Sequence, residues 1–139
     1  MSGGNLRLIF VVTLAGIACA LTMAGATPGE EAVTAAQKWL SLLDDKKYEE
    51  SWKQAGSRFR DDVKQEQWVD ALKRSREPLG SLVSRTGARV QLTTTLRGAP
   101  DGEYAVIHFT TALQNKTITE RLDLLKEDGR WQVFAYAIH

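Results

Sequence analysis

The spacing of apolar residues changes about halfway along this chain. Before Gly80 they recur every three or four residues, which predicts amphipathic helices. After Gly80 they alternate with polar residues, which predicts β-strands. Helices followed by strands in this order predict an α+β fold, with three N-terminal helices packed on one face of a four-stranded antiparallel meander.

Three apolar stripes predict the helices. They are Ala32, Val33, Ala36, Trp39, Leu40 and Leu43; then Tyr48, Trp52 and Ala55; and then Trp68, Ala71, Leu72 and Ser75. Pro28 with two acids after it suits the start of the first helix, and Pro78 with Gly80 ends the third. Phe59 and Val63 are expected in a connector between the second and third helices.

Two short turns predict the register of the strands. Asn115-Lys116 and Asp128-Gly129 are expected as two-residue loops, and Asp-Gly is a strong hairpin signal. The core face then contains one row of Leu92, Ile107, Leu124 and Val133 and a second row of Val90, Phe109, Leu122 and Ala135. The opposite face carries Phe134, Tyr136 and Ile138, which we expect either on a solvated surface or in a homodimer interface.

The first 26 residues have the pattern of a secretory signal. Arg7 precedes an apolar run from Leu8 to Leu21, and Ala24-Gly25-Ala26 offers the small residues of a cleavage site. We therefore expect cleavage after Ala26, leaving residues 27–139 as one periplasmic or secreted α+β domain. Two alternatives stay open: a retained membrane anchor, and lipidation at Cys19 with cleavage before it.

Composition excludes several classes of function. With 18 Lys and Arg against 17 Asp and Glu, the chain lacks the basic surface of a nucleic-acid binder. Cys19 is the only cysteine, and His108 and His139 are the only histidines, so no metal site is expected. No cofactor is expected either, because neither a phosphate-binding loop nor a dinucleotide fingerprint is present. No membrane contact is expected in the mature form unless Cys19 is lipidated.

His108 and Asp123 form the first candidate catalytic pair. The expected register places them directly opposite each other on neighbouring strands, where a carboxylate could orient an imidazole as a general base and raise its pKa. The alternative is a half-exposed ion pair on the outer face of the sheet, which would add only about 0.2–1 kcal/mol of stability.

Glu120 is the second candidate. Its position in the alternation places it on the core face, next to Thr111 and Ala137 and with Ala88 next in the row. Small neighbours could leave a cavity at the wide end of a cone-shaped fold, where a desolvated acid could move protons. The alternative is a frayed end of the sheet, where Glu120 reaches water. Trp52 and Trp68 are candidate ligand-binding residues, although tryptophans at helical spacing more often belong to the core.

Motifs spread over most of the chain resemble those of a known family. They include Trp39-Leu40, Tyr48, Ser51-Trp52, Phe59-Arg60, Trp68, Arg76-Glu77-Pro78-Leu79-Gly80, Ser84-Arg85, Gly98-Ala99-Pro100-Asp101-Gly102-Glu103-Tyr104, Asn115-Lys116, Glu127-Asp128-Gly129-Arg130-Trp131 and Tyr136. Together they resemble the bacterial secreted family known as domain of unknown function 4019. The resemblance implies export and a single domain. It implies no activity and no catalytic residues, because that family is uncharacterised.

The order of elements is also similar to the cone-shaped nuclear transport factor 2-like fold, which hosts isomerases, dehydratases and binding modules alike. Our leading interpretation is a non-catalytic exported module that binds a small apolar ligand or a protein partner. The alternatives are a small enzyme of isomerase or dehydratase type that uses an isolated acid, and a structural homodimerisation module.

Overall fold

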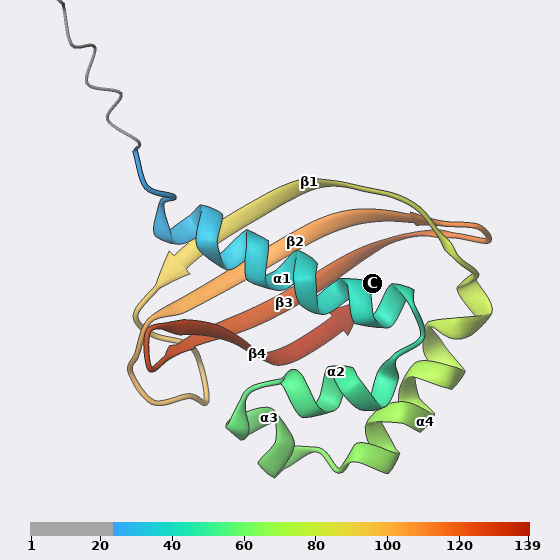
Figure 1. Ribbon diagram of the computed structural model, residues 1–139, viewed down its shortest axis with the longest axis horizontal. Coiled ribbons are helices and arrows are strands. Elements are labelled where there is room, and N and C mark those ends of the chain that lie inside the picture. The colour runs from blue at the N-terminus through green and yellow to red at the C-terminus, as the bar shows by residue number, and fades with distance from the viewer. Residues whose placement is uncertain (1–23) are drawn as a thin grey trace, which may run out of the picture.

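A computed structural model describes residues 24–139. The expected signal sequence falls largely outside this range, and so does Cys19. The elements run α1 (Pro28–Asp44), α2 (Tyr48–Gln54), α3 (Ser57–Asp62), α4 (Gln65–Ser75), a 3-10 turn η1 (Glu77–Leu79), β1 (Leu82–Thr93), β2 (Tyr104–Leu113), β3 (Thr117–Glu127) and β4 (Arg130–Ile138) (Figure 1). The expected α+β arrangement is confirmed, and the expected connector contains the short helix α3.

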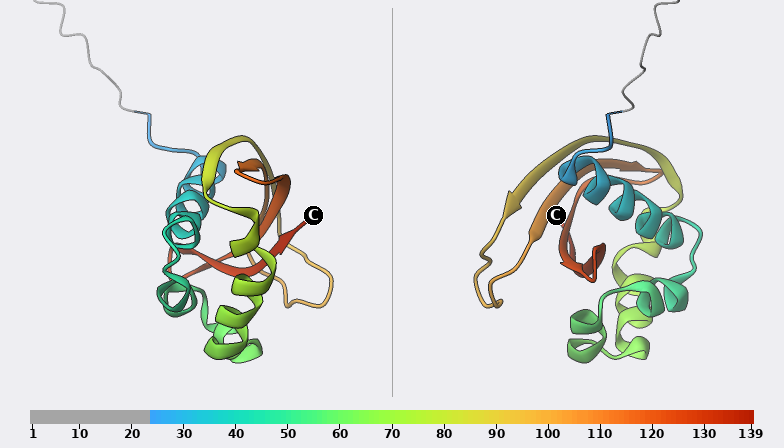
Figure 2. Two further views of the ribbon diagram at one scale, coloured as in Figure 1. Left: turned by 90° about the vertical axis from the view of Figure 1, so that its right-hand side faces the viewer. Right: turned by 60° about the vertical axis from the view of Figure 1, so that its left-hand side comes forward.

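The strands form one antiparallel sheet in the order β1-β2-β3-β4. The sheet curves around α1, which lies across its inner face, while α2, α3 and α4 gather beyond β4 (Figure 2). The core lies between these layers. Its members include Trp39, Leu40, Leu43, Phe59, Trp68, Leu72, Ile107, Phe109, Leu122, Leu124 and Val133.

A capping box begins α1. Thr27 Oγ1 accepts a hydrogen bond from the Glu30 backbone N–H at 3.2 Å, and the Glu30 carboxylate accepts one from the Thr27 N–H at 3.1 Å. These bonds satisfy two of the donors that a helix start leaves unpaired. Pro28 follows at the first turn, where its missing N–H costs nothing.

The hairpin between β3 and β4 has the expected turn. Asp128 and Gly129 have φ values of 50° and 75°, so both take the left-handed conformation of a type I′ turn. Leu124 pairs with Val133 as predicted. The register then shifts, because Asp123 pairs with Ala135 and leaves Phe134 as the extra residue of a β-bulge.

This bulge corrects three sequence-based placements. Beyond Phe134, Leu122 pairs with Tyr136 and Glu120 with Ile138, so both C-terminal residues turn toward the core face. Ala135 pairs with Asp123 and turns to the outer face instead. The expected outer-face cluster of Phe134, Tyr136 and Ile138 therefore does not exist as a continuous patch.

The turn between β2 and β3 lies one residue earlier than expected. Leu113 N–H donates to Lys116 O at 2.9 Å, so Gln114 and Asn115 form the loop. The Asn115 side chain donates to Pro78 O at 3.0 Å and its backbone N–H to Leu79 O at 2.9 Å, which ties this turn to η1. The pairing consequently moves by two residues, which keeps each side chain on its expected face but changes its partner.

The edge strand β1 is much more exposed than predicted. Val90 and Leu92 were expected in the core but are 37% and 50% exposed, because α1 covers only part of this strand. Two register irregularities interrupt β1, and Gly87 has a φ of 67°. Bulges of this kind keep a sheet edge from pairing with another chain. In the part of the chain that the structure describes, no helix is both long and apolar enough to span a membrane.

Candidate functional site

Glu120 lies at the centre of a buried polar cluster, which we call the Glu120 network. Its members are Asp44 at the end of α1, Arg76 after α4, Arg85 on β1, Thr111 on β2, Glu120 on β3 and Tyr136 on β4. The network thus joins all four strands to two helices. It contains two arginines and two carboxylates, so its charges balance.

The contacts within the Glu120 network are short and numerous. Arg85 Nη1 and Nη2 each donate to the Asp44 carboxylate at 2.9 Å, and Arg85 Nε donates to Glu120 Oε1 at 3.0 Å. Arg76 Nη2 donates to Asp44 Oδ1 at 2.6 Å. Thr111 Oγ1 donates to Glu120 Oε1 at 2.6 Å, and the Tyr136 hydroxyl donates to Glu120 Oε2. Both oxygens of Glu120 are therefore occupied.

The charges of the network hold its members in defined protonation states. Desolvation by burial acts to raise the pKa of Asp44, but the hydrogen bonds and charges of Arg85 and Arg76 outweigh it, and the pKa lies below its ordinary value. Burial, followed by the charge of Glu120, raises the pKa of Tyr136 far above its usual range. Tyr136 thus stays protonated and donates to Glu120.

Burial of Glu120 contradicts both expectations for it, the open cavity and the frayed end of the sheet where it would reach water. Its exposed fraction is 0%, and Arg85 and Arg76 occupy the space next to it. Its pairing partners are Phe109 and Ile138 instead of Thr111 and Ala137. Ala88 does not reach this row, because the irregularity between Thr86 and Arg89 brings Arg85 opposite Thr111.

Sequence reasoning missed Asp44, Arg76, Arg85 and Tyr136 as members of this cluster. One signal was available. A buried acid on the core face requires a cation, but the expected register put Ala88 in this row, so it did not single out Arg85.

The predicted pairing of His108 with Asp123 is wrong. His108 lies between Arg121 on β3 and Arg89 on β1, whereas Asp123 pairs with Val106. Asp123 instead accepts two hydrogen bonds from Arg121, at 2.9 and 3.2 Å. Desolvation and the charges of the two arginines lower the pKa of His108, which is opposite to the expected direction.

Trp68 and Trp52 occupy the interior between the helices. Trp68 is 7% exposed and donates from Nε1 to Ser51 Oγ at 2.9 Å. Trp52 donates from Nε1 to Val63 O at 2.7 Å. Trp68 also stacks edge-on against Phe59 and Tyr136. Both indoles are thus used in packing, as the core interpretation expected.

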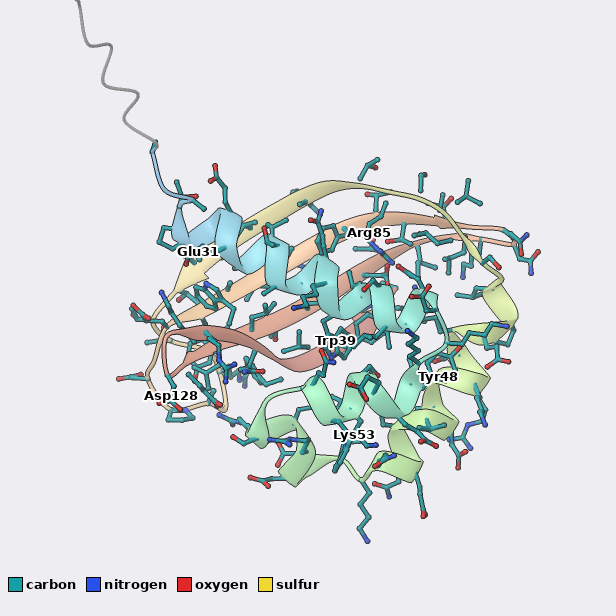
Figure 3. The ribbon with its side chains drawn as sticks, in the orientation of Figure 1. Glu31, Trp39, Tyr48, Lys53, Arg85 and Asp128 are labelled. Carbon is teal, nitrogen blue, oxygen red and sulfur yellow. The ribbon has the colours of Figure 1, made fainter. Side chains whose placement is uncertain are left out.

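An open groove lies on the side of the molecule that carries the β3–β4 hairpin. We call it the hairpin groove, because α1, the α2–α3 junction and the β3–β4 hairpin form its walls. It has a volume of about 920 Å³. Its floor includes Trp39, Ala55, Gly56, Trp131 and Val133. Figure 3 shows Glu31 and Asp128 at one end of this region, with Lys53 on α2 beyond Trp39.

Charged side chains surround the hairpin groove. Four cations line it, namely Lys38 on α1, Lys53 on α2, Arg60 on α3 and Arg130 on β4. Within residues 24–139, none of these four takes part in a salt bridge. The acids Glu31, Glu127 and Asp128 belong to the start of α1 and to the hairpin.

Trp131 lines the hairpin groove and carries a buried donor that is unpartnered among the described residues. Its Nε1 is buried and has no hydrogen-bond partner in the described part of the chain. The Lys126 ammonium lies 5.6 Å from the centre of its ring. A buried N–H without an acceptor costs roughly 1–3 kcal/mol, so this indole would gain from any acceptor that its Nε1 could reach.

Comparison with known proteins identifies the family. The pattern of the family described as "Protein of unknown function (DUF4019)" matches residues 35–136, so the chain belongs to this family. No curated protein matches the chain. Among residues 24–139, no group of three or more His, Cys, Asp or Glu side chains is arranged to hold a metal ion. The likeness to the nuclear transport factor 2-like fold stays a prediction.

Proposed function

We propose that this protein is an exported, non-catalytic binding module and that the hairpin groove is its binding site. The observation that carries the proposal is the groove itself, which combines four cations that form no salt bridge within residues 24–139 with a buried donor that has no acceptor in that range. The buried donor costs free energy in the free protein and would gain a partner when a ligand binds, and the exposed cations could bind anionic groups of that ligand.

The Glu120 network supports a non-catalytic role. A general acid or base must come within hydrogen-bond reach of its substrate. Glu120 has no exposed surface and already accepts bonds from Thr111, Arg85 and Tyr136. These contacts favour a role in holding the helices to the sheet.

A pair of matched variants tests whether the groove is the binding site. Thr34 is an exposed residue of α1 that lines the groove, and Gln37 is an exposed residue of α1 outside its lining. The variant T34W would fill the groove without disturbing the core, and Q37W is its control. A panel of peptides and small apolar molecules is screened by NMR against the protein recovered from a bacterial host.

We expect a panel member to shift the amide signals of the groove residues. T34W should weaken its binding by about tenfold or more, equivalent to about 1.4 kcal/mol, whereas Q37W should leave it unchanged. A panel with no binder would contradict the proposal, and so would a ligand that binds T34W as well as the native protein.

A further inference from the structure

We infer that the ligand of the hairpin groove is an extended peptide segment that carries acidic side chains. This inference rests on the proposed function and adds the chemical class of the ligand. It follows from three features of the groove: the direction of the β4 backbone, the distribution of charge, and the unpartnered indole of Trp131.

The backbone of β4 offers a free edge along the groove. Gly56 N–H donates to Val133 O at 2.8 Å, so the Val133 carbonyl points away from β3. Lys126 on β3 is the pairing partner of Trp131. The Lys126 N–H donates to Glu103 O on the β2 side, so it points away from β4. The Trp131 backbone groups therefore point the same way as those of Val133, since residues two apart on a strand share one direction.

The Gly56 contact shows that the outer edge of β4 accepts backbone hydrogen bonds. The α2–α3 junction already forms one backbone hydrogen bond with β4, at Val133. Toward the hairpin, the next outward-facing residue is Trp131, which lines the groove. An extended peptide laid from Gly56 toward Asp128 would continue the pairing along β4, as in strand addition to a sheet edge.

The cations on the helical side of the groove favour a ligand segment with acidic side chains. Lys38, Lys53 and Arg60 come from three different helices, and no salt bridge within residues 24–139 uses them. The acids of the groove lie instead on the hairpin and at the start of α1. Carboxylates on a bound segment would complement the helical cations and would raise the rate of association at low salt.

The Trp131 indole is a hydrogen-bond donor, and a peptide has many carbonyl oxygens that could accept from it. Its Nε1 has no acceptor among the described residues and is buried beside the β4 edge. A peptide carbonyl or side-chain carboxylate in the groove would accept from it after a rotation of the indole. Residues 1–23 contain no acidic side chain, so this chain's own N-terminal segment does not fit the charge of the site.

The test uses three labelled ten-residue peptides with the same alternation of residues. One alternates Glu with Thr, the second replaces Glu by Gln, and the third replaces Glu by Lys. Fluorescence anisotropy measures their affinity for the protein recovered from a bacterial host. The variants are K53Q in the groove, K116Q on the distant β2–β3 turn as its control, and W131F, which keeps an aromatic ring but removes the donor.

We expect the Glu peptide alone to bind. K53Q should weaken it about threefold to tenfold and make its affinity less sensitive to salt, while K116Q should have no effect. W131F should weaken it by about fivefold or more, since one hydrogen bond contributes about 1 kcal/mol. Circular dichroism establishes that each variant is folded.

The outcomes separate the ligand class from the proposed function. Equal binding of the Glu and Gln peptides, or preference for the Lys peptide, would overturn the acidic class and leave the groove as a peptide site. Binding of a small apolar molecule that T34W blocks, with no peptide binding, would overturn the peptide class alone. If nothing binds, both proposals fail.

Discussion

The Glu120 network and the hairpin groove differ in how their polar groups are paired. In the Glu120 network, two arginines and two carboxylates are buried with short contacts and balanced charge. In the hairpin groove, the cationic side chains are exposed, and the Trp131 Nε1 is buried with no acceptor among the described residues. The comparison teaches that the more conspicuous cluster of charges is fully used in contacts within the fold, while the groove with an unused buried donor is the better candidate for binding.

The largest effect should come from breaking the Glu120 network. R85M removes the side chain that bridges Asp44 and Glu120 and leaves two carboxylates with one arginine. Loss of one partner from a buried ion pair costs about 3–5 kcal/mol of unfolding free energy. Urea unfolding at pH 7 measures it.

The control for R85M is R121M. Arg121 is 40% exposed and pairs with Asp123 on the surface of the sheet, and an exposed pair contributes about 0–1 kcal/mol. Equal costs for R85M and R121M would show that the fold does not need Arg85 to keep the two buried carboxylates paired.

The two tryptophans give the next largest difference. W68F and W131F remove the same atoms, but only W68F leaves behind the hydroxyl of Ser51 that Trp68 contacts at 2.9 Å. The Ser51 hydroxyl still donates to Tyr48 O at 2.6 Å, so W68F removes one buried hydrogen bond and should cost about 0.5–1.5 kcal/mol more unfolding free energy than W131F. Thermal and urea unfolding of both variants provide the measurement. Similar losses would indicate that the Trp131 N–H has a partner in solution.

Acid should weaken the Glu120 network at Asp44. Its pKa in the folded protein lies below the ordinary value of 3.8. As the pH falls below 3.8, the unfolded chain binds the proton first, and the unfolding free energy decreases. Urea unfolding between pH 5 and pH 2 should therefore show a shallower decline for D44N than for the native protein. D62N, on the exposed surface of α3, is the control and should follow the native curve.

The smallest effect should be at His108. H108Q should change the unfolding free energy at pH 7 by less than about 0.5 kcal/mol, as is usual for surface substitutions. The folded-state pKa of His108 lies below 6.5, so native stability should decrease slightly as the pH falls below 6.5. H108Q should remove that decrease. An unfolding free energy that rises on acidification through this range would contradict the arrangement of Arg89 and Arg121 around the imidazole.

The sequence predicted the faces of the strands better than their partners. Alternation placed Ile107, Phe109, Leu122 and Leu124 correctly in the core, because a shift of two residues preserves side-chain direction. The turn at Gln114-Asn115 was missed because its anchor, Pro78 in η1, is distant in sequence. Burial of β1 was overestimated because alternation does not reveal how far α1 extends over the sheet.

The candidate site was only partly predictable. Glu120 stood out because it interrupts an apolar face, but its partners come from α1, the end of α4 and β1. Long-range contacts of this kind leave little local pattern. The hairpin groove left no local pattern at all. Whether the Trp131 Nε1 finds an acceptor depends on elements that are distant in sequence.

The bulge at Phe134 has a consequence for the evolution of this family. A single extra residue reverses the phase of the last five positions of the chain, so that Tyr136 reaches Glu120 while Ala135 faces outward. A deletion at this point would restore simple alternation and turn the tyrosine hydroxyl away from the carboxylate. Insertions and deletions in β4 should therefore be tolerated in the hairpin turn but selected against between Val133 and Ala135, where one residue decides which side chains the interior receives.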